Sequence, residues 1–220
     1  MKILALEFSS EERSVAVAVD REAGVAICGT AAEKGGRQTN AFAMIESALR
    51  QAQISRNAIE CLCVGIGPGS YTGIRVAISV AQGWQLARNV KLLGISSADC
   101  LARQAQSDRR HGVVNVAIDA QRNEFYLAAY AIGKDSVKMV EPLHLVSAGE
   151  VMARISSGQS VIGPGLRDVL PGASDVWPQA ATLAGLAAHR SDFASGELLE
   201  PIYLRTTAFV KAAPSRVLPS

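Results

Sequence analysis

The chain has 220 residues, of which 49% are hydrophobic, 5% aromatic and 19% charged, with a formal net charge of +2. This composition is typical of a soluble globular protein with an aliphatic core, and the length allows one large domain or two small ones. It excludes a helical membrane protein, because no apolar run reaches the roughly 18 residues that a membrane span needs.

The N-terminus and the cysteines indicate a cytoplasmic protein. The opening residues MKILALEFSS contain an apolar run that Glu7 interrupts, which is too short for a signal peptide. Cys61 and Cys63 share one face of a predicted strand, but neither Cys28 nor Cys100 completes a zinc site with them, so we expect no metal.

The first half of the chain is predicted to alternate strands and helices. Period-two patterns and short apolar runs indicate the strands, and apolar residues three and four apart indicate the helices. The predicted elements are strands at Lys2–Phe8, Ser14–Asp20 and Val25–Glu33, a helix at Gln38–Ala52, a strand at Cys61–Ile66, a helix from about Thr72 to Asn89, a strand at Lys91–Ile95 and a helix from Ser96 or Ser97 to Ser107.

A polar stretch at Asp108–Gly112 is the best candidate for a linker, which predicts domains at residues 1–108 and 109–220. The second half then repeats the pattern. Its predicted elements are strands at Val113–Asp119, Glu124–Ile132 and Val137–Leu145, a helix from Ser147 to Ile155, an apolar strand at Val161–Ile162 that leads into Gly163–Gly165, and a helix at Gln179–Arg190.

Three segments of the first half have counterparts in the second. LALE, ending at Glu7, matches VAID, ending at Asp119; SVAVAV matches FYLAAY; and VGIGPG matches VIGPG. This internal duplication predicts an α/β protein of two RNase-H-like domains, each with a mixed sheet flanked by helices. Such a pair is the architecture of the actin-like (ASKHA) fold.

The segment GPGSYTGIR is a glycine-rich junction between a strand and a helix. Such a loop can cradle a phosphate with backbone N–H groups, here at Gly67, Gly69, Ser70 and Gly73. It lacks the lysine of a P-loop and the spacing of a dinucleotide fingerprint. We therefore favour a structural reading, in which the glycines permit a sharp turn and close packing of the helix on the strand.

The helix that follows this loop is apolar over an arc of about 200°, although a helix that docks on one sheet needs only about 100°. Its apolar residues are Ile74, Val76, Ala77, Ile78, Val80, Ala81, Trp84 and Ala87. Either it lies centrally in its domain or a partner covers it. The helix at Gln38–Ala52 also has a wide apolar arc, so the two helices could form half of a four-helix interface.

Two acids end matching strands, and together Glu7 and Asp119 could hold a magnesium-bound nucleotide in a shared cleft. The alternative, which we favour for Glu7, is that each acid caps the adjacent turn. No two of His111, His144 and His189 are spaced as a helical zinc pair, and no G-x-S-x-G motif occurs. The residues do not show a self-sufficient catalytic set.

The chain resembles the bacterial TsaB (YeaZ) family over nearly its whole length. The resemblance rests on KILALEFSS with SVAVAV, on GIGPGSYTGIRVAISVAQG, on AIDAQRNEFYLAAY and on EPIYLR, in that order and spacing. It is weaker between about Gly158 and Gln179 and in the tail. Proteins of this family are non-catalytic paralogues of TsaD, which transfers threonylcarbamoyl to adenosine next to the tRNA anticodon, and the ATPase TsaE joins the complex.

The resemblance implies an actin-like fold and a scaffold role in the cytoplasm, with tRNA contacted indirectly and no membrane partner. The N-terminal domain would bind a TsaD-like transferase through its two helices and would form a homodimer when that partner is absent. The implied contact residues are Phe42, Ile45, Leu49, Tyr71, Thr72, Arg75, Val76, Ala77, Val80 and Trp84. This chain alone would bind no cofactor, and any ATP or ADP with magnesium would lie at the partner interface.

The sequence also departs from the family pattern. Glu7-Phe8 replaces the usual Asp-Thr, and Arg37-Gln38 stands where a histidine often occurs. Where TsaD-like proteins carry a metal-binding histidine pair, this chain reads GGRQTNAFAMI. Competing hypotheses are an actin-like ATPase or kinase, a glycoprotease-type metallopeptidase, and a homodimer with a small-molecule cleft.

The end of the chain is basic, because no acid follows Glu200 while Arg205, Lys211 and Arg216 remain. We interpret this segment as a solvated tail in preference to a tail that binds tRNA or a partner.

Overall fold

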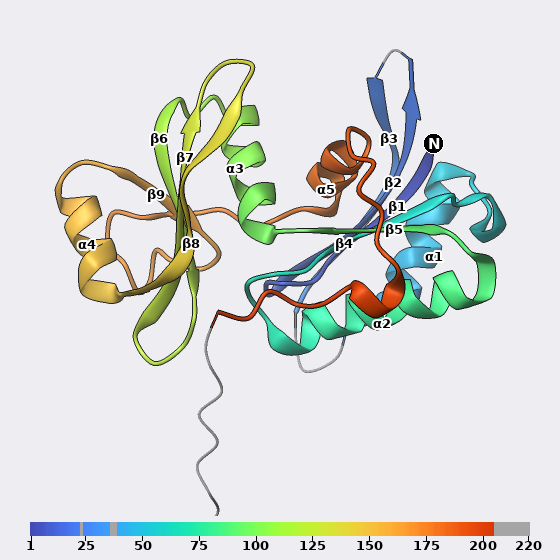
Figure 1. The fold of residues 1–220 in the computed structure, drawn as a ribbon, viewed down its shortest axis with the longest axis horizontal. Coiled ribbons are helices and arrows are strands. Elements are labelled where there is room, and N and C mark those ends of the chain that lie inside the picture. The colour runs from blue at the N-terminus through green and yellow to red at the C-terminus, as the bar shows by residue number, and fades with distance from the viewer. Residues whose placement is uncertain (23, 36–38, 205–220) are drawn as a thin grey trace, which may run out of the picture.

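Two five-stranded sheets, each flanked by helices, make up the chain (Figure 1). The computed structural model describes residues 1–22, 24–35 and 39–204. The first sheet has the order β3-β2-β1-β4-β5, in which β1 pairs antiparallel with β2 and parallel with β4. Its strands are β1 (Lys2–Glu7), β2 (Glu12–Arg21), β3 (Gly24–Lys34), β4 (Cys61–Gly65) and β5 (Lys91–Ile95).

The second sheet repeats this topology with the order β8-β7-β6-β9-β10. β6 pairs antiparallel with β7 and parallel with β9, as β1 does with β2 and β4. The duplication and the actin-like arrangement of two RNase-H-like units are therefore confirmed. The strands are β6 (Gly112–Asp119), β7 (Glu124–Ile132), β8 (Val137–Ser147), β9 (Ser160–Gly163) and β10 (Ser174–Asp175).

The helices lie close to their predicted positions. They are α1 (Ala41–Ala52), α2 (Tyr71–Arg88), α3 (Ser97–Ser107), α4 (Ala148–Ser156) and α5 (Ala180–Ala187), with short 3-10 turns η1 (Arg56–Ala58) and η2 (Gly196–Leu198). The predicted start of the first helix at Gln38 lies outside the described residues. β10 and η2, which have two and three residues, are too short to show a periodic pattern.

Each sheet has helices on both faces (Figure 1). α1 and α2 cover one face of the first sheet, and α5 covers the other. α3 and α4 cover opposite faces of the second sheet. A division at residue 108 stays a prediction, but the helices do not follow it: α3 precedes residue 108 and packs on β6, while α5 follows it and packs on β1 and β2.

The chain returns to the first unit after α5. The Ala194 amide donates to the Leu92 carbonyl at 2.9 Å, and the Ile202 amide donates to the Ile66 carbonyl at 2.9 Å. Between them, Gln82 Nε2 of α2 donates to the Gly196 carbonyl at 2.8 Å. These bonds fix residues 194–202 beside α2, whereas Arg205, Lys211 and Arg216 of the predicted tail lie outside the described residues.

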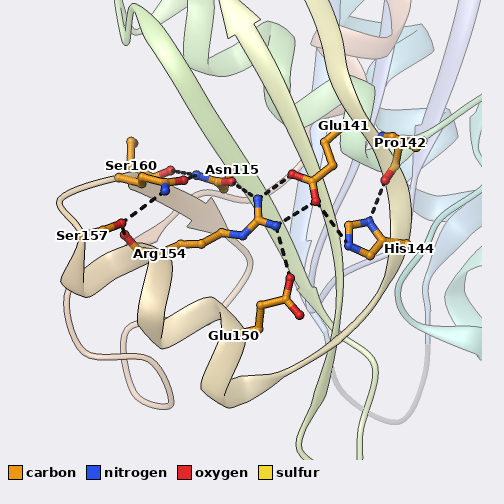
Figure 2. A network of polar contacts seen from close by, with 9 residues as sticks. Asn115, Glu141, Pro142, His144, Glu150, Arg154, Ser157 and Ser160 are labelled. Carbon is orange, nitrogen blue, oxygen red and sulfur yellow. Dashed lines mark hydrogen bonds and ion pairs between the residues drawn. The ribbon is translucent and has the colours of Figure 1, made fainter.

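A polar network attaches α4 to the second sheet (Figure 2). Arg154 on α4 donates to both carboxylate oxygens of Glu141 on β8, at 2.6 and 2.8 Å, and to Asn115 Oδ1 on β6 at 2.9 Å. The hydrogen bonds from Arg154 to the Glu141 carboxylate hold the pKa of Glu141 below its usual range. Since Asn115 is buried, its satisfied amide explains how a polar residue is tolerated inside the second unit.

Candidate functional site

The glycine-rich junction places the start of α2 directly on the end of β1. A Cβ at Gly69 would lie 2.1 Å from the Ser9 carbonyl oxygen, and one at Gly73 would lie 1.9 Å from that of Phe8. Ser70 caps the helix, because its Oγ accepts from the Gly73 amide at 3.3 Å. Close packing explains Gly69 and Gly73, and a phosphate contact by Gly67, Gly69, Ser70 and Gly73 stays a prediction.

α2 has a sheet-facing side and an outward side. Its buried residues pack with β1 and β4 in the core, and they are Ile74, Ala77, Ile78 and Ala81. Val76, Val80 and Trp84 are half-buried at the edge of the same core, while Thr72 and Arg75 are exposed. The predicted wide apolar arc therefore exists, and only part of it is covered by the chain itself.

Two of the predicted contact residues lie in the core and do not line the outward surface, so their contact with a partner stays a prediction. Leu49 and Ala77 are buried in the core under α1 and α2, where helical periodicity points them at the sheet. Ile45 is also buried, although it forms part of the floor of a groove. Phe42, one turn before Ile45 on α1, is instead 69% exposed.

A groove of about 340 Å³ runs between α1, η1 and α2. Its lining residues are Phe42, Ile45, Glu46, Arg56, Asn57, Ser79, Val80, Gly83, Trp84, Ala87 and Arg88. A second apolar hollow continues it toward the start of α2, where Tyr71, Thr72 and Val76 join the lining. The structure therefore brings eight of the ten predicted contact residues to one continuous surface, which we call the α1–α2 surface.

Sequence reasoning missed several residues of the α1–α2 surface. Gly83 lies in the interior of α2, and a Cβ built there would meet no atom within 4 Å, so the fold of this chain does not require a glycine. Leu86 on the same helix is 90% exposed but lines neither the groove nor the hollow that continues it. A helix-interior glycine was a signal that could have pointed to Gly83. Arg56 and Asn57 arrive from η1, which has no such signal.

An aromatic cluster joins the end of the described chain to the start of α2. The rings of Tyr71 and Tyr203 lie 5.6 Å apart between centroids, and the Arg75 guanidinium lies 5.0 Å from the Tyr71 ring centroid. Partial burial raises the pKa of the Tyr203 phenol. The cluster fixes one boundary of the α1–α2 surface.

A second cavity, of about 680 Å³, lies between the two units. Ser9, Ser70, Asp119 and Gly165 are among its lining residues. Asp119 also accepts from the Gln121 amide at 2.7 Å, so it caps its turn as the alternative reading expected.

Glu7 does not line this cavity with Asp119, and it caps the adjacent turn as the favoured alternative predicted. Its carboxylate is fully buried and accepts from the Ser9 amide at 2.7 Å and from Ser97 Oγ at 3.1 Å. Burial raises its pKa above the usual value. The extra methylene relative to aspartate places the carboxylate against Gly65, where a Cβ would collide with it.

The part of the chain that the structure describes offers neither a metal-binding cluster nor a membrane-spanning helix. No group of three or more His, Cys, Asp or Glu side chains in it could hold a metal ion. Among its helices, none has the length and apolar character needed to span a membrane.

This chain is similar to known protein sequences and to solved protein structures. Residues 36–164 match the family model described as TsaD, tRNA N6-adenosine threonylcarbamoyltransferase. The tRNA threonylcarbamoyladenosine biosynthesis protein TsaB of Escherichia coli is 29% identical, across 98% of this chain and all of that protein. The TsaB of Haemophilus influenzae is 34% identical across 39% of this chain and 36% of its own length.

Among solved structures, YeaZ from Pseudomonas aeruginosa superposes with a TM-score of 0.74 at 26% identity, across 92% of this chain and 99% of its own. A second Pseudomonas aeruginosa structure, of an uncharacterized protein with similarity to the peptidase YeaZ, has a TM-score of 0.76 at 27% identity, across 93% and 99%. The family model matches more than half of the residues, and the Escherichia coli and Pseudomonas aeruginosa proteins match more than nine tenths of them. The chain therefore belongs to the TsaD family of tRNA N6-adenosine threonylcarbamoyltransferases, in its TsaB (YeaZ) group.

Proposed function

We propose that this chain is a non-catalytic scaffold subunit in the biosynthesis of threonylcarbamoyladenosine in tRNA. It binds a TsaD-like transferase, which a TsaE-like ATPase joins, and so supports transfer of the threonylcarbamoyl group to adenosine next to the anticodon. It acts in the cytoplasm and contacts tRNA only through its partners. The observation that carries this proposal is the α1–α2 surface.

The α1–α2 surface has the character of a protein interface. Phe42 is exposed, and Val76, Val80 and Trp84 are left half-buried beside a continuous groove. Contiguous apolar patches with polar rims mark interaction sites, and aromatic residues are enriched at their centres. The open space above Gly83 would let the backbone of a partner helix approach α2 closely.

The relatives supply the reaction context of the proposal. The Escherichia coli relative is a biosynthesis protein for threonylcarbamoyladenosine in tRNA, and the family model describes the transferase itself. A chain that shares the fold of the transferase can pair with it through equivalent helices, since related subunits associate by pseudo-symmetric contacts. Without that partner, the same surface would pair with a second copy.

The position of Glu7 supports a role without catalysis by this chain. An acid that organises a metal must offer its oxygens to the ion. The Glu7 oxygens are instead occupied by the Ser9 amide and the Ser97 hydroxyl inside the protein. The proposal therefore includes no cofactor bound by this chain alone, and places any ATP or ADP with Mg²⁺ at the partner interface.

The cavity between the two units favours the alternative of an independent ATPase or kinase. It is larger than the groove between α1 and α2, and Gly69 and Gly165 of the two Gly-Pro-Gly loops line it together with Asp119. This alternative requires turnover by the chain alone. No comparable observation favours the metallopeptidase alternative.

Reconstitution tests the proposal. Modified tRNA is measured with TsaD-like and TsaE-like proteins from the same organism, ATP and the threonylcarbamoyl donor, with and without this chain. We expect modification to depend on the chain, and the chain alone to hydrolyse no ATP and modify no tRNA. Full modification without it, or ATP turnover by it alone, would overturn the scaffold role.

A further inference from the structure

The charges around the α1–α2 surface are nearly all of one sign. Arg56 and Arg88 line the groove, and Arg75 lines the apolar hollow that continues it. Glu46 is the one acid among the described residues that line either cavity, and it already forms an ion pair with Arg56. The sequence of α2 contains no acid at all. Since Glu46 offsets the charge of Arg56, it is Arg75 and Arg88 that leave the rim of the apolar groove basic.

Arg88 is held in position at the mouth of the groove. Its Nη1 donates to Asn57 Oδ1 at 2.7 Å, and its Nη2 donates to the Asn57 carbonyl at 3.4 Å. Both acceptors are neutral, so the positive charge of Arg88 is fixed without being neutralised. A guanidinium that is already oriented forms strong charge-assisted hydrogen bonds with a carboxylate at low entropic cost.

We propose that this arginine rim selects a partner whose facing helices carry acidic residues around an apolar ridge, and that it weakens pairing with a second copy of this chain. The inference rests on the proposed function, because it names the chemistry of the partner at the same surface. It adds that specificity comes from charge, whereas the apolar groove supplies most of the affinity.

A second copy is a poor match for reasons of symmetry. In a two-fold dimer the same patch meets itself, so the arginines of one copy approach those of the other. Glu46 is already engaged, and Glu200 lines a neighbouring hollow that shares Arg75 and Ser79 with the α1–α2 surface but does not line that surface itself. Like charges that face each other across an interface are a common device against wrong partners. An acidic partner gains attraction where a second copy gains repulsion.

Ionic strength and one charge reversal test the inference. Affinity for the TsaD-like protein is measured by titration calorimetry, and self-association by sedimentation equilibrium, at about 50 mM and about 500 mM NaCl, since salt screens exposed charges. We expect partner affinity to fall and self-association to tighten as salt rises. Arg88→Glu should weaken partner binding about tenfold at low salt. Lys138→Glu, an equal charge change on exposed β8, is the matched control and should have no effect.

Val80→Glu separates this inference from the proposed function, because it places a charge in the apolar lining of the groove. If Val80→Glu abolishes binding while salt and Arg88→Glu leave it unchanged, the surface is right and selection by charge is wrong. If Val80→Glu leaves binding intact, the proposed surface is wrong as well. Self-association that weakens with added salt would also overturn the inference.

Discussion

α2 and α5 pack on opposite faces of the first sheet, and both carry more apolar surface than one sheet can cover. α5 contains no charged residue, and its inner side is buried in a cluster with β1 and β2. Its other side meets α3, which belongs to the packing of the second unit. α2 is covered by the sheet, with α1 on one side and residues 194–202 on the other, and its outward side stays open.

The difference shows how two similar apolar patterns can serve different ends. α3 contacts α5, and no large apolar residue of α5 is exposed, so the apolar residues of α5 stabilise the fold. Nothing in the described chain completes the burial of α2, so its outward apolar residues are available to a partner. A substitution in α5 should therefore affect folding, and one on the outward side of α1 or α2 should affect association.

The largest expected effect is a loss of stability on substitution in α5, which the chain itself covers. Leu183 of α5 is fully buried, and Leu183→Ala should lower the free energy of unfolding by about 2–5 kcal/mol, because a cavity adds to the lost burial. Urea unfolding of the chain alone measures it. The control is Leu86→Ala at the exposed leucine of α2, with an expected change within about 0.5 kcal/mol. Equal losses in both variants would contradict the comparison.

The next largest effect is a loss of partner association on substitution at the α1–α2 surface. Phe42→Ala should weaken association with the TsaD-like partner by about 30-fold, or about 2 kcal/mol, if the exposed ring fills a pocket of that partner. Stability of the chain alone should stay within about 0.5 kcal/mol of the unmodified protein. Val169→Ala, at an exposed apolar residue of the second unit, should leave the affinity unchanged. An unaltered affinity for Phe42→Ala would remove Phe42 from the interface.

The pH dependence of stability tests the role of the buried Glu7 carboxylate. This carboxylate links the end of β1 to Ser97 at the start of α3. Burial raises the pKa of Glu7 in the folded state above 4.5. The stability that the protonated carboxyl contributes is therefore fully present below pH 4.5, and it is lost as the pH rises through the folded-state pKa. In Glu7→Gln the amide oxygen can accept from the Ser9 amide while the amide NH2 donates to Ser97 Oγ, and the neutral group avoids this loss.

We therefore expect Glu7→Gln to exceed the unmodified chain in stability at about pH 8, and the gap to narrow toward about pH 4. Urea unfolding of both proteins across this range measures the gap. A gap that is constant with pH would show that ionisation of the carboxylate has no part in it.

The smallest effect is expected at Gly83. Since a Cβ there meets no atom of this chain, Gly83→Ala should stabilise the isolated protein by about 0.5–1 kcal/mol through helix propensity. The same methyl should weaken binding of the TsaD-like partner if the partner's backbone approaches at this point. Thermal unfolding and titration calorimetry measure the two effects, and tighter binding by the variant would contradict close approach.

Local patterns in the sequence were sufficient to predict the helices and strands and the internal duplication. The strand β7 was predicted with its observed bounds, and the matched segments at β1 and β6, β2 and β7, and β4 and β9 predicted two units of one topology. The glycines before α2 were read correctly as a close-packed junction. These features are set by residues that are close together in the sequence, so a single sequence is enough to predict them.

Long-range contacts decided the rest. Period-based reasoning identified the apolar residues of α2, but it could not tell that Ala77 faces β1 while Val80 faces the groove. The placement of α5 on the first sheet, the burial of Glu7 and the meeting of Arg56 with Arg88 at one groove each join residues far apart in the chain. Hydrophobic periodicity reports which side chains avoid water, whereas only the tertiary structure shows what covers them and which ones are left for a partner.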